Sequence, residues 1–255
     1  MKVSIITVVW NNKATIKNAM DSVLSQDYND IEYIVIDGGS GDGTIDVIDK
    51  YRNKISIFLS EPDKGIYDAL NKGIGLASGE VVAILHSDDQ FCNSRVVSNM
   101  MEKIEQTKVE FCFSNMVLVD EPSGKILRYY MASYFKIWMF KIGWMPPHPT
   151  CFIKRSLFDE FGMYSTDYKI AGDFDLLVRF FYSRKIRWSY LNQVTVKMST
   201  GGVSNSGWRS KKLVYSEISR SLKSNNAWSL PVFQLARYAI RLMEVIIKPK
   251  KGRYD

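Results

Sequence analysis

The sequence predicts an α/β fold in which a mainly parallel β-sheet is flanked by helices, with a small antiparallel part and further helices at the C-terminus. Three observations support this prediction. Up to about residue 106, short runs of apolar and β-branched residues alternate with segments of helical periodicity. Each apolar run ends in a polar loop. The chain has 255 residues, 46% of them apolar, which is enough for one large domain with a small appendage.

The first part of the chain contains four expected strands, each a short apolar run. A helix is expected after each strand, because apolar residues recur there three and four positions apart. The first of these helices follows Asn11 and Asn12, and we expect an asparagine to cap it. The expected strands are 3–9 (VSIITVV), 31–36 (IEYIVI), 55–59 (ISIFL) and 80–85 (EVVAIL), and the expected helices are 16–24, one beginning near Thr44, Ile66–Leu76 and Ser94–Ile104.

Beyond residue 106 the pattern changes to antiparallel strands and longer helices. Residues 109–119 and 124–132 form an expected hairpin around the turn DEPSG, and an aromatic-rich stretch follows at 134–149. That stretch either packs in the core or lines an acceptor site. The remaining expected elements are a short strand at 150–156, a helix at 171–185, one or two strands at 187–198, a loop at 200–207 and two basic helices.

Polar loops follow all four strands of the first part, with the sequences WNN, DGGSGDG, SEPDKG and HSDD. Ligands of parallel sheets bind at the carboxyl ends of strands, so these loops are expected at one edge of the sheet. The loop at 37–44 (DGGSGDGT) does not match the dinucleotide-binding pattern, because Thr44 stands where the third glycine belongs. Asp37 can instead accept hydrogen bonds from a nucleobase or a ribose. The alternative is a turn whose aspartate and serine only cap the next helix.

Two adjacent carboxylates, Asp88 and Asp89, follow the fourth strand. Like charges this close repel, and each raises the pKa of the other. A Mg²⁺ or Mn²⁺ ion held by one or two carboxylates and by substrate phosphates would remove this conflict. The alternative is a solvated turn. His86 beside the pair and His148 in PPHPT are the only histidines, and each could ligate the metal, touch phosphate or have a purely structural role.

Asp173 and Asp175 lie in the first turn of the helix expected at 171–185. They either complement the helix dipole or, in the case of Asp173, provide a general base aimed at an acceptor hydroxyl. The sequence has no G-x-S-x-G, H-E-x-x-H or cysteine–histidine signature, which argues against hydrolases and proteases.

Charge divides the chain into two parts. The whole chain carries +7, whereas the part from Trp208 onward has eleven Lys/Arg and three Asp/Glu, a net of +8. We therefore predict a catalytic domain, 1–207, and a basic helical tail, 208–255. The tail combines a broad apolar face with a narrow polar stripe, which is typical of an in-plane membrane helix. The stripe consists of Gln234, Arg237, Arg241, Glu244 and Lys248.

Two alternatives for the tail are packing on the domain and packing on a second copy of the chain, so a homo-oligomer stays open. We expect no nucleic-acid partner, because the basic residues lie beside an apolar face and are not interleaved with exposed aromatic side chains.

Three widely spaced cysteines without a CxxC pair predict a reducing compartment rather than a disulfide framework. The apolar run after Met1 and Lys2 has only seven residues, and no run of about 18 uncharged apolar residues follows. We therefore expect neither a signal peptide nor a spanning helix. Together with the tail, this predicts a cytoplasmic protein that associates peripherally with the inner face of the plasma membrane.

Taken together, the motifs resemble those of inverting family-two glycosyltransferases with the GT-A fold, of the type that builds bacterial surface polysaccharides. The resemblance covers about residues 1–205. Its carriers are TVVWNN at 7–12, DGGSGDGT at 37–44, SEPDKGIYDALNKGIGLASGE at 60–80, HSDD at 86–89, PHPT at 147–150 and AGDFDL at 171–176.

The resemblance implies a nucleoside-diphosphate sugar donor, most often a UDP-sugar, and a glycan acceptor, here lipid-linked because of the tail. It also implies inversion at the anomeric carbon and a role in O-antigen, lipopolysaccharide or other polysaccharide biosynthesis. The site residues it implies are Thr7, Val9 and Asp37 at the base, Asp63, Lys64 and Gly65 near the uridine or diphosphate, Asp88 at ribose or metal, Asp89 at the metal with His148 as a further candidate ligand, and Asp173 as the catalytic base.

Two positions depart from the family pattern. His86 stands where the family often has an acid, and Gly172 replaces a glutamate that often precedes the base. An inactive nucleotide-sugar-binding protein is therefore one alternative. A sugar nucleotidyltransferase is another, although it would need a glycine- and arginine-containing loop after the first strand, and WNNKAT has neither residue.

Overall fold

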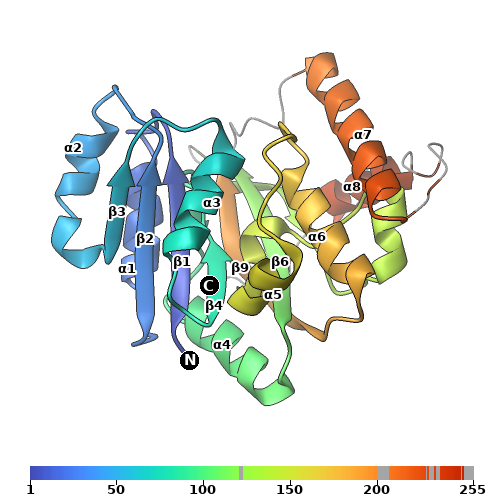
Figure 1. Cartoon of the computed structure of the whole chain (residues 1–255), viewed down its shortest axis with the longest axis horizontal. Helices are drawn as coiled ribbons and strands as arrows, with labels where there is room; N and C mark the ends of the chain where they lie inside the picture. The colour runs from blue at the N-terminus through green and yellow to red at the C-terminus, as the bar shows by residue number, and fades with distance from the viewer. Residues whose placement is uncertain are drawn as a thin grey trace.

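The computed structural model describes residues 1–120, 123–199 and 207–227, together with 229, 233, 236–247 and 249 (Figure 1). The strands in these residues form one sheet with the order β3-β2-β1-β4-β8-β6-β9-β5, and β7 pairs with β6 beside this path. The strands are β1 (Val3–Val9), β2 (Ile31–Asp37), β3 (Ile57–Ser60), β4 (Val81–Ile84), β5 (Asp89–Phe91), β6 (Phe111–Asp120), β7 (Lys125–Tyr130), β8 (Phe152–Lys154) and β9 (Trp188–Ser199).

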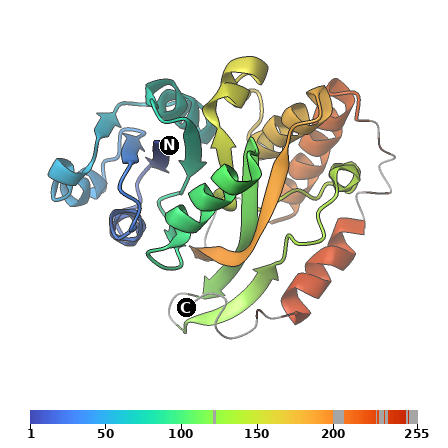
Figure 2. The same cartoon turned by 90° about the horizontal axis from the view of Figure 1, so that it is seen from below.

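Helices cover both faces of this sheet (Figures 1 and 2). The α-helices are α1 (Ile16–Leu24), α2 (Thr44–Asp49), α3 (Ile66–Leu76), α4 (Val96–Thr107), α5 (Arg155–Phe161), α6 (Gly172–Ser183), α7 (Gly207–Ser224) and α8 (Ala236–Ile246). Short 3₁₀ segments are η1 (Arg52–Lys54), η2 (Ile137–Ile142) and η3 (His148–Thr150). One apolar core lies between the sheet and α1 and α4, and a second lies between the sheet and α3, α5 and α6.

The expected α/β sheet is confirmed, and its first half is parallel. β1 pairs in parallel with β2 and β4, and β2 pairs in parallel with β3. Val9 lies opposite Asp37, and Asp37 lies opposite Ser60, so the ends of these strands meet at one edge. The antiparallel part is larger than expected, because β8 pairs antiparallel with both β4 and β6, and β5 with β9.

Among the expected elements, the helix at Ile66–Leu76 has the predicted bounds, and the hairpin of β6 and β7 is antiparallel as predicted. The asparagine cap was wrong. α1 begins after Thr15, and no side chain caps it. Asn11 and Asn12 bridge loops instead, because the Asn11 side chain accepts a hydrogen bond from the Gly41 N–H (2.9 Å) and the Asn12 amide donates to the Ser87 hydroxyl (2.9 Å).

The aromatic-rich stretch contributes mainly to the core. Phe135, Phe140 and Trp144 are buried, and their rings pack against one another and against Phe181 of α6. Trp138 is exposed. Most of the expected loop at 200–207 lies outside the described residues.

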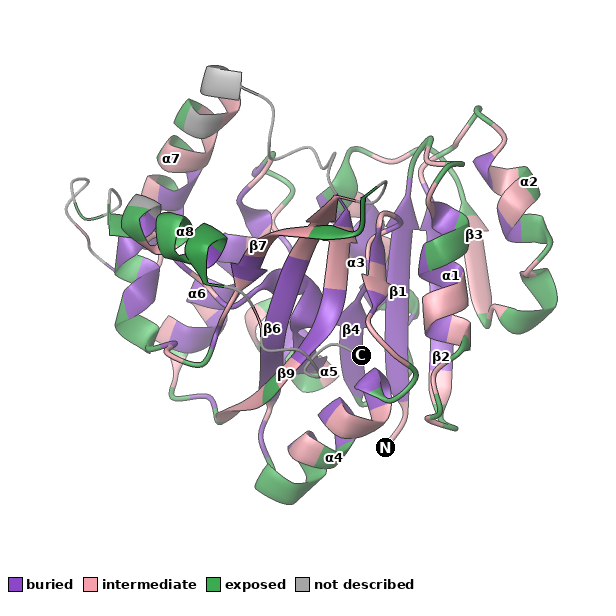
Figure 3. Ribbon diagram, turned by 180° about the vertical axis from the view of Figure 1, so that it is seen from behind, coloured by how far each residue is buried: buried purple, intermediate pink, exposed green. Residues whose placement is uncertain are grey.

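Helix α8 packs on β7 with Arg237 and Glu244 buried, and most of its other described residues are exposed (Figure 3). Glu244 is buried, pairs with Arg128 of β7 through the Arg128 Nε at 2.7 Å, and accepts a hydrogen bond from the Trp144 indole (3.3 Å). Leu242 and Ile246 are 63% and 69% exposed. Of the expected stripe, Gln234 and Lys248 lie outside the described residues. Within the described part of the chain, no helix is long and apolar enough to cross a membrane.

Candidate active site

Asp37, the last residue of β2, organises the glycine-rich loop through one of its two carboxylate oxygens. Oδ2 accepts hydrogen bonds from the backbone N–H groups of Gly39 and Ser40 (both 3.0 Å) and from the Ser60 hydroxyl (2.7 Å). Gly39 has a positive φ of 82°, which lets the loop turn back over the carboxylate. Oδ1 is buried and has no partner among the described residues. It is therefore a buried acceptor whose hydrogen-bonding capacity is not used within the described part of the chain.

The loop before α3 lies directly against the Asp37 loop. A Cβ atom at Gly38 would overlap the Asp63 carboxylate, so the missing side chain allows this approach. Asp63 Oδ1 accepts a hydrogen bond from the N–H of Gly65 (2.8 Å), which has a φ of 113°. Lys64 is exposed. The structure thus brings Asp37 and Asp63 together, with Lys64 at the rim of the same loop.

Strand β1 contributes less than expected. The side chains of Thr7 and Val9 are buried on the face covered by α1, and the Thr7 hydroxyl accepts a hydrogen bond from the Tyr33 hydroxyl (3.1 Å). Any contact of these two residues with a base would therefore come from the backbone. The exposed side chain at this strand end is Trp10, whose ring would lie 3.4 Å from a Cβ atom at Gly38.

Asp88 lies in the turn between β4 and β5, and Asp89 is the first residue of β5. The Asp89 N–H donates to the His86 carbonyl (3.0 Å), which tightens the turn. Asp89 is buried, and neither carboxylate oxygen has a partner among the described residues. Burial, and secondarily the charge of Asp88, raises its pKa well above the ordinary value. Asp88 is half-buried.

This pair fits a divalent cation that takes most of its ligands from a substrate. No group of three or more His, Cys, Asp or Glu side chains is placed to hold a metal within the part of the chain that the structure describes. One or two carboxylates would leave the remaining positions to diphosphate oxygens and water, as is usual for Mg²⁺. The unpartnered oxygens of Asp89 are the observation that supports this fit.

His148 is buried beside His86, with ring centroids 6.2 Å apart. Its Nε2 hydrogen-bonds to the Tyr164 hydroxyl (2.6 Å). Burial, with a smaller contribution from His86, lowers the pKa of His148 to about 3, so the ring is neutral. Because Nε2 is already hydrogen-bonded to the Tyr164 hydroxyl, His148 holds that side chain in place.

Asp173 lies in the first turn of α6 and is half-buried. Burial raises the pKa of its carboxyl group from 3.8 to about 6, and the Phe174 N–H, which donates to Oδ1 at 2.8 Å, opposes the rise. A general base works best when its pKa is close to the operating pH. The raised pKa of Asp173 is therefore closer to neutral pH than that of an ordinary carboxylate in the first turn of a helix.

Tyr67 connects Asp173 to the rest of the edge. Its hydroxyl donates to the Ile170 carbonyl (2.6 Å) and accepts from the Gly172 N–H (2.8 Å). Its ring stacks on Tyr164, the partner of His148, with centroids 5.7 Å apart. The start of α3, the HSDD turn, the PHPT segment and the start of α6 are thus joined by direct contacts.

Gly172, one of the two departures from the family pattern, has a physical explanation. A Cβ atom there would lie 2.7 Å from the ring of Tyr67. A side chain at this position would displace the tyrosine, so the glycine and the tyrosine belong together.

Three residues at this edge were missed from the sequence: Trp10, Tyr67 and Tyr164. Trp10 carried a signal, because a large aromatic residue at the end of a buried strand is seldom needed for packing. Tyr67 and Tyr164 carried none, since each fits an apolar position of a helix or loop.

Two curated glycosyltransferases illustrate the similarity of the chain to known proteins. An uncharacterised glycosyltransferase of Mycobacterium tuberculosis (strain CDC 1551 / Oshkosh) is 33% identical over 186 residues, 69% of this chain and 68% of that protein. The UDP-Glc:alpha-D-GlcNAc-diphosphoundecaprenol beta-1,3-glucosyltransferase WfaP of Escherichia coli is 38% identical over 114 residues, 44% of this chain and 45% of that protein.

Solved structures share the fold. S. aureus TarS 1–349 in complex with UDP-GlcNAc matches with a TM-score of 0.72 and 20% identity, over 87% of this chain and 66% of that chain. The mannosyltransferase PcManGT from Pyrobaculum calidifontis, in complex with GDP-Man and Mn²⁺, matches with a TM-score of 0.62 and 17% identity, over 97% and 81%. The chain thus spans about two thirds of the TarS chain that it matches.

The family model of Glycosyl transferase family 2 matches residues 4–169, well over half of the sequence. That stretch contains β1 to β4, the Asp37 and Asp63 loops, the HSDD turn and the PHPT segment. The chain belongs to glycosyl transferase family 2.

Proposed function

We propose that this protein transfers a sugar from a UDP-sugar to a hydroxyl group of a glycan acceptor, with inversion at the anomeric carbon. The observation that carries the proposal is the environment of Asp173, which raises the pKa of its carboxyl group to about 6. The residues just before Asp173 are hydrogen-bonded to Tyr67, which follows the Asp63–Gly65 loop by two residues. Helix α3, which begins directly after this loop, therefore connects the proposed donor site to the segment that carries the proposed base.

Asp37, Asp63 and Trp10 are the proposed donor-binding residues. The buried Oδ1 of Asp37 can accept a hydrogen bond from the uracil N–H, and the exposed indole of Trp10 can stack on the base. Thr7 and Val9 would contribute backbone contacts, and Lys64 and Gly65 would lie near the uridine or the diphosphate. TarS, which shares the fold, was solved with UDP-GlcNAc, and this supports a UDP-sugar donor.

Asp88 and Asp89 would hold Mn²⁺ or Mg²⁺. When bound, the metal would neutralise the charge of the departing nucleoside diphosphate. PcManGT, which shares the fold, was solved with Mn²⁺. His148 is a weaker candidate ligand, because its Nε2 is bonded to Tyr164.

In the proposed reaction, the Asp173 carboxylate accepts the proton of the acceptor hydroxyl. The acceptor oxygen forms a bond to the anomeric carbon as the bond from that carbon to the diphosphate oxygen breaks. One in-line displacement inverts the configuration, so an α-linked donor gives a β-linked product. The name of the relative WfaP specifies a beta-1,3 linkage.

The transfer proposal is tested by incubating the full chain with UDP-sugars, Mn²⁺ and lipid-linked or free glycans and following the release of UDP. We expect transfer by the wild-type protein and none by Asp173→Asn, while UDP binding measured by calorimetry persists in the variant. Transfer by the variant at the wild-type rate would show that Asp173 is not the base.

We further propose a lipid-linked acceptor in cell-surface polysaccharide biosynthesis, such as an O-antigen, and peripheral association with the cytoplasmic face of the membrane. The named acceptor of WfaP is diphosphoundecaprenol-linked. In this chain, α8 turns Leu242, Met243 and Ile246 outward while Glu244 is buried against Arg128. The +8 charge of residues 208–255 complements anionic lipids.

Point variants separate this membrane proposal from a role in folding. Leu242→Glu and Ile246→Glu should abolish sedimentation with phosphatidylglycerol vesicles and leave the melting temperature unchanged, because both side chains already contact solvent. Leu76→Glu, on an exposed apolar position of α3, is the matched control and should sediment normally. Normal sedimentation of both α8 variants would refute membrane binding by this face, and loss of a dimer in them would assign the face to a second copy of the chain.

A further inference from the structure

We propose that Glu217 of α7 is a positioning residue for the catalytic base. Helix α7 lies beyond residues 4–169, the stretch that matches the family model, and sequence reasoning assigned it only to a basic tail. The inference rests on the proposed function, because it names how the segment that carries Asp173 is held in place.

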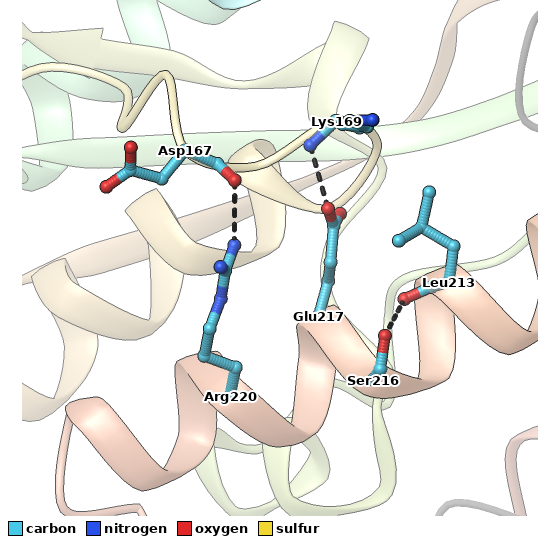
Figure 4. Close-up of a pocket in the computed structure, with 6 residues that line it drawn as sticks. All are labelled: Asp167, Lys169, Leu213, Ser216, Glu217 and Arg220. Atoms are coloured by element: carbon cyan, nitrogen blue, oxygen red, sulfur yellow. Dashed lines mark hydrogen bonds between the residues drawn. The ribbon is translucent and has the colours of Figure 1, made fainter.

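The Glu217 carboxylate accepts hydrogen bonds from three consecutive backbone N–H groups, and Figure 4 shows the first of them, from Lys169. Oε1 accepts from Lys169 at 2.8 Å, and Oε2 accepts from Ile170 and Ala171 at 3.0 and 2.9 Å. Glu217 is only 5% exposed. These N–H groups immediately precede α6, so they have no helical partners of their own. The carboxylate fixes the direction in which α6 begins, and Asp173 follows two residues after Ala171.

Other side chains of α7 hold both ends of the same segment. On one side, Arg220 donates to the Asp167 carbonyl (2.9 Å), and its guanidinium lies 4.0 Å from the centre of the Tyr168 ring. On the other side, the buried Ser221 hydroxyl donates to Asp175 (2.9 Å). The base therefore lies between two anchor points on one helix.

Tyr67 holds the segment from the opposite direction. The Tyr67 hydroxyl donates to the Ile170 carbonyl, while Glu217 accepts from the Ile170 N–H. Side chains of α3 and α7 therefore bind the same residue from two helices. α3 begins directly after the Asp63–Gly65 loop. In this arrangement α3 sets the position of the base relative to the donor, and α7 sets its orientation.

A carboxylate suits this role better than an amide. Its two oxygens accept all three N–H groups, whereas glutamine has one acceptor oxygen and would turn its own N–H₂ group toward backbone N–H groups. Charge gives a second effect. Burial is the main cause of the raised pKa of Asp173, and Glu217 adds a smaller contribution; Asp173 in turn raises the pKa values of Tyr67, Tyr164 and Cys151.

One feature of the sequence indicates that Glu217 has a specific role. Glu217 is the only acid in α7, among Arg209, Lys211, Lys212, Arg220 and Lys223. A single carboxylate in a basic helix suggests a specific partner, and here the partner is backbone.

The test compares Glu217→Gln, Glu217→Asp and the control Ser216→Ala in the full chain. Ser216 is exposed, and its one hydrogen bond among the described residues goes to the Leu213 carbonyl of its own helix, so its variant should match the wild type (Figure 4). For Glu217→Gln we expect kcat to fall by about 10- to 100-fold with the donor KM unchanged, because small misplacement of a reacting group has effects of this size. We also expect the acidic limb of its pH–rate profile to move to lower pH, because a negative charge near Asp173 is gone. Glu217→Asp should restore the position of the limb and part of kcat.

A wild-type kcat and an unmoved acidic limb in Glu217→Gln would overturn the inference. If Glu217→Gln does not fold, Glu217→Asp, whose side chain is one carbon shorter, replaces it, with an expected several-fold loss of kcat at unchanged donor KM; a wild-type kcat there would equally overturn the inference. Failure of the proposed function has a different signature, because the wild-type protein itself would then transfer no sugar.

Discussion

Replacing Asp173 with asparagine should abolish transfer and at the same time stabilise the fold. The asparagine side chain has the same size, and its oxygen can still accept the Phe174 N–H that Asp173 accepts at 2.8 Å. The substitution removes only the charge. Stability and activity should therefore change in opposite directions, which distinguishes a functional carboxylate from a structural one.

The magnitude follows from the raised pKa of Asp173. Burial raises this pKa from 3.8 to about 6, so the folded protein binds the proton more tightly than the unfolded chain. Stability is therefore lost as the pH rises from about 4 through 6. Each pKa unit corresponds to about 1.4 kcal/mol, which gives about 3 kcal/mol at pH 8. Partial exposure of the side chain reduces the expected gain to about 1–2 kcal/mol.

Urea unfolding of both proteins at pH 8 and pH 5 measures this gain. The variant should be more stable by about 1–2 kcal/mol at pH 8 and by about half as much at pH 5. The wild-type kcat/KM should fall about tenfold between pH 7 and pH 5, because the fraction of ionised base in the free enzyme falls by that factor around a pKa of about 6. Equal stabilities at pH 8 together with a flat rate profile down to pH 5 would refute the reasoning.

Three further variants test the other parts of the site. Asp37→Asn should fold, because an amide oxygen can replace Oδ2, but calorimetry should find UDP bound about 10- to 100-fold more weakly, since the buried acceptor Oδ1 becomes a donor. Gly172→Ala should lower the free energy of unfolding by about 1–3 kcal/mol and reduce transfer, because its Cβ would lie 2.7 Å from the Tyr67 ring. Gly75→Ala is the control, because a Cβ atom there would meet open space. Equal melting temperatures for the two variants would contradict the packing argument. Asp89→Asn should remove the increase that Mn²⁺ gives to the UDP-induced thermal shift without lowering the melting temperature of the free protein, and an undiminished Mn²⁺ effect would exclude Asp89 as a ligand.

The parts of the fold that depend on local pattern were predictable. Helix α3 has its predicted bounds because apolar residues repeat on one face and a glycine precedes it. β5 was missed because its three residues pair, within the described part of the chain, with residues of β9 that lie more than 100 positions later, and nothing local marks them. The asparagine cap was wrong because Asn11 and Asn12 bond to loops that are distant in sequence.

The candidate site was predictable as a set of strand ends but not as a set of contacts. The register that places Val9, Asp37 and Ser60 side by side follows from parallel pairing. By contrast, the positions of Tyr67 and Glu217 depend on packing between helices far apart in the sequence. The orientation of α8 also depends on tertiary partners, because Arg128 and Trp144 bind Glu244 and thereby turn the apolar face outward.

A crystal structure of the full chain with UDP and Mn²⁺ tests the central claim most directly. The account predicts uracil at Asp37 and Trp10, the diphosphate and metal at Asp88 and Asp89, and the Asp173 carboxylate facing the space where the sugar would be. A nucleotide bound elsewhere, or bound at this edge with Asp173 turned away from the diphosphate, would contradict it.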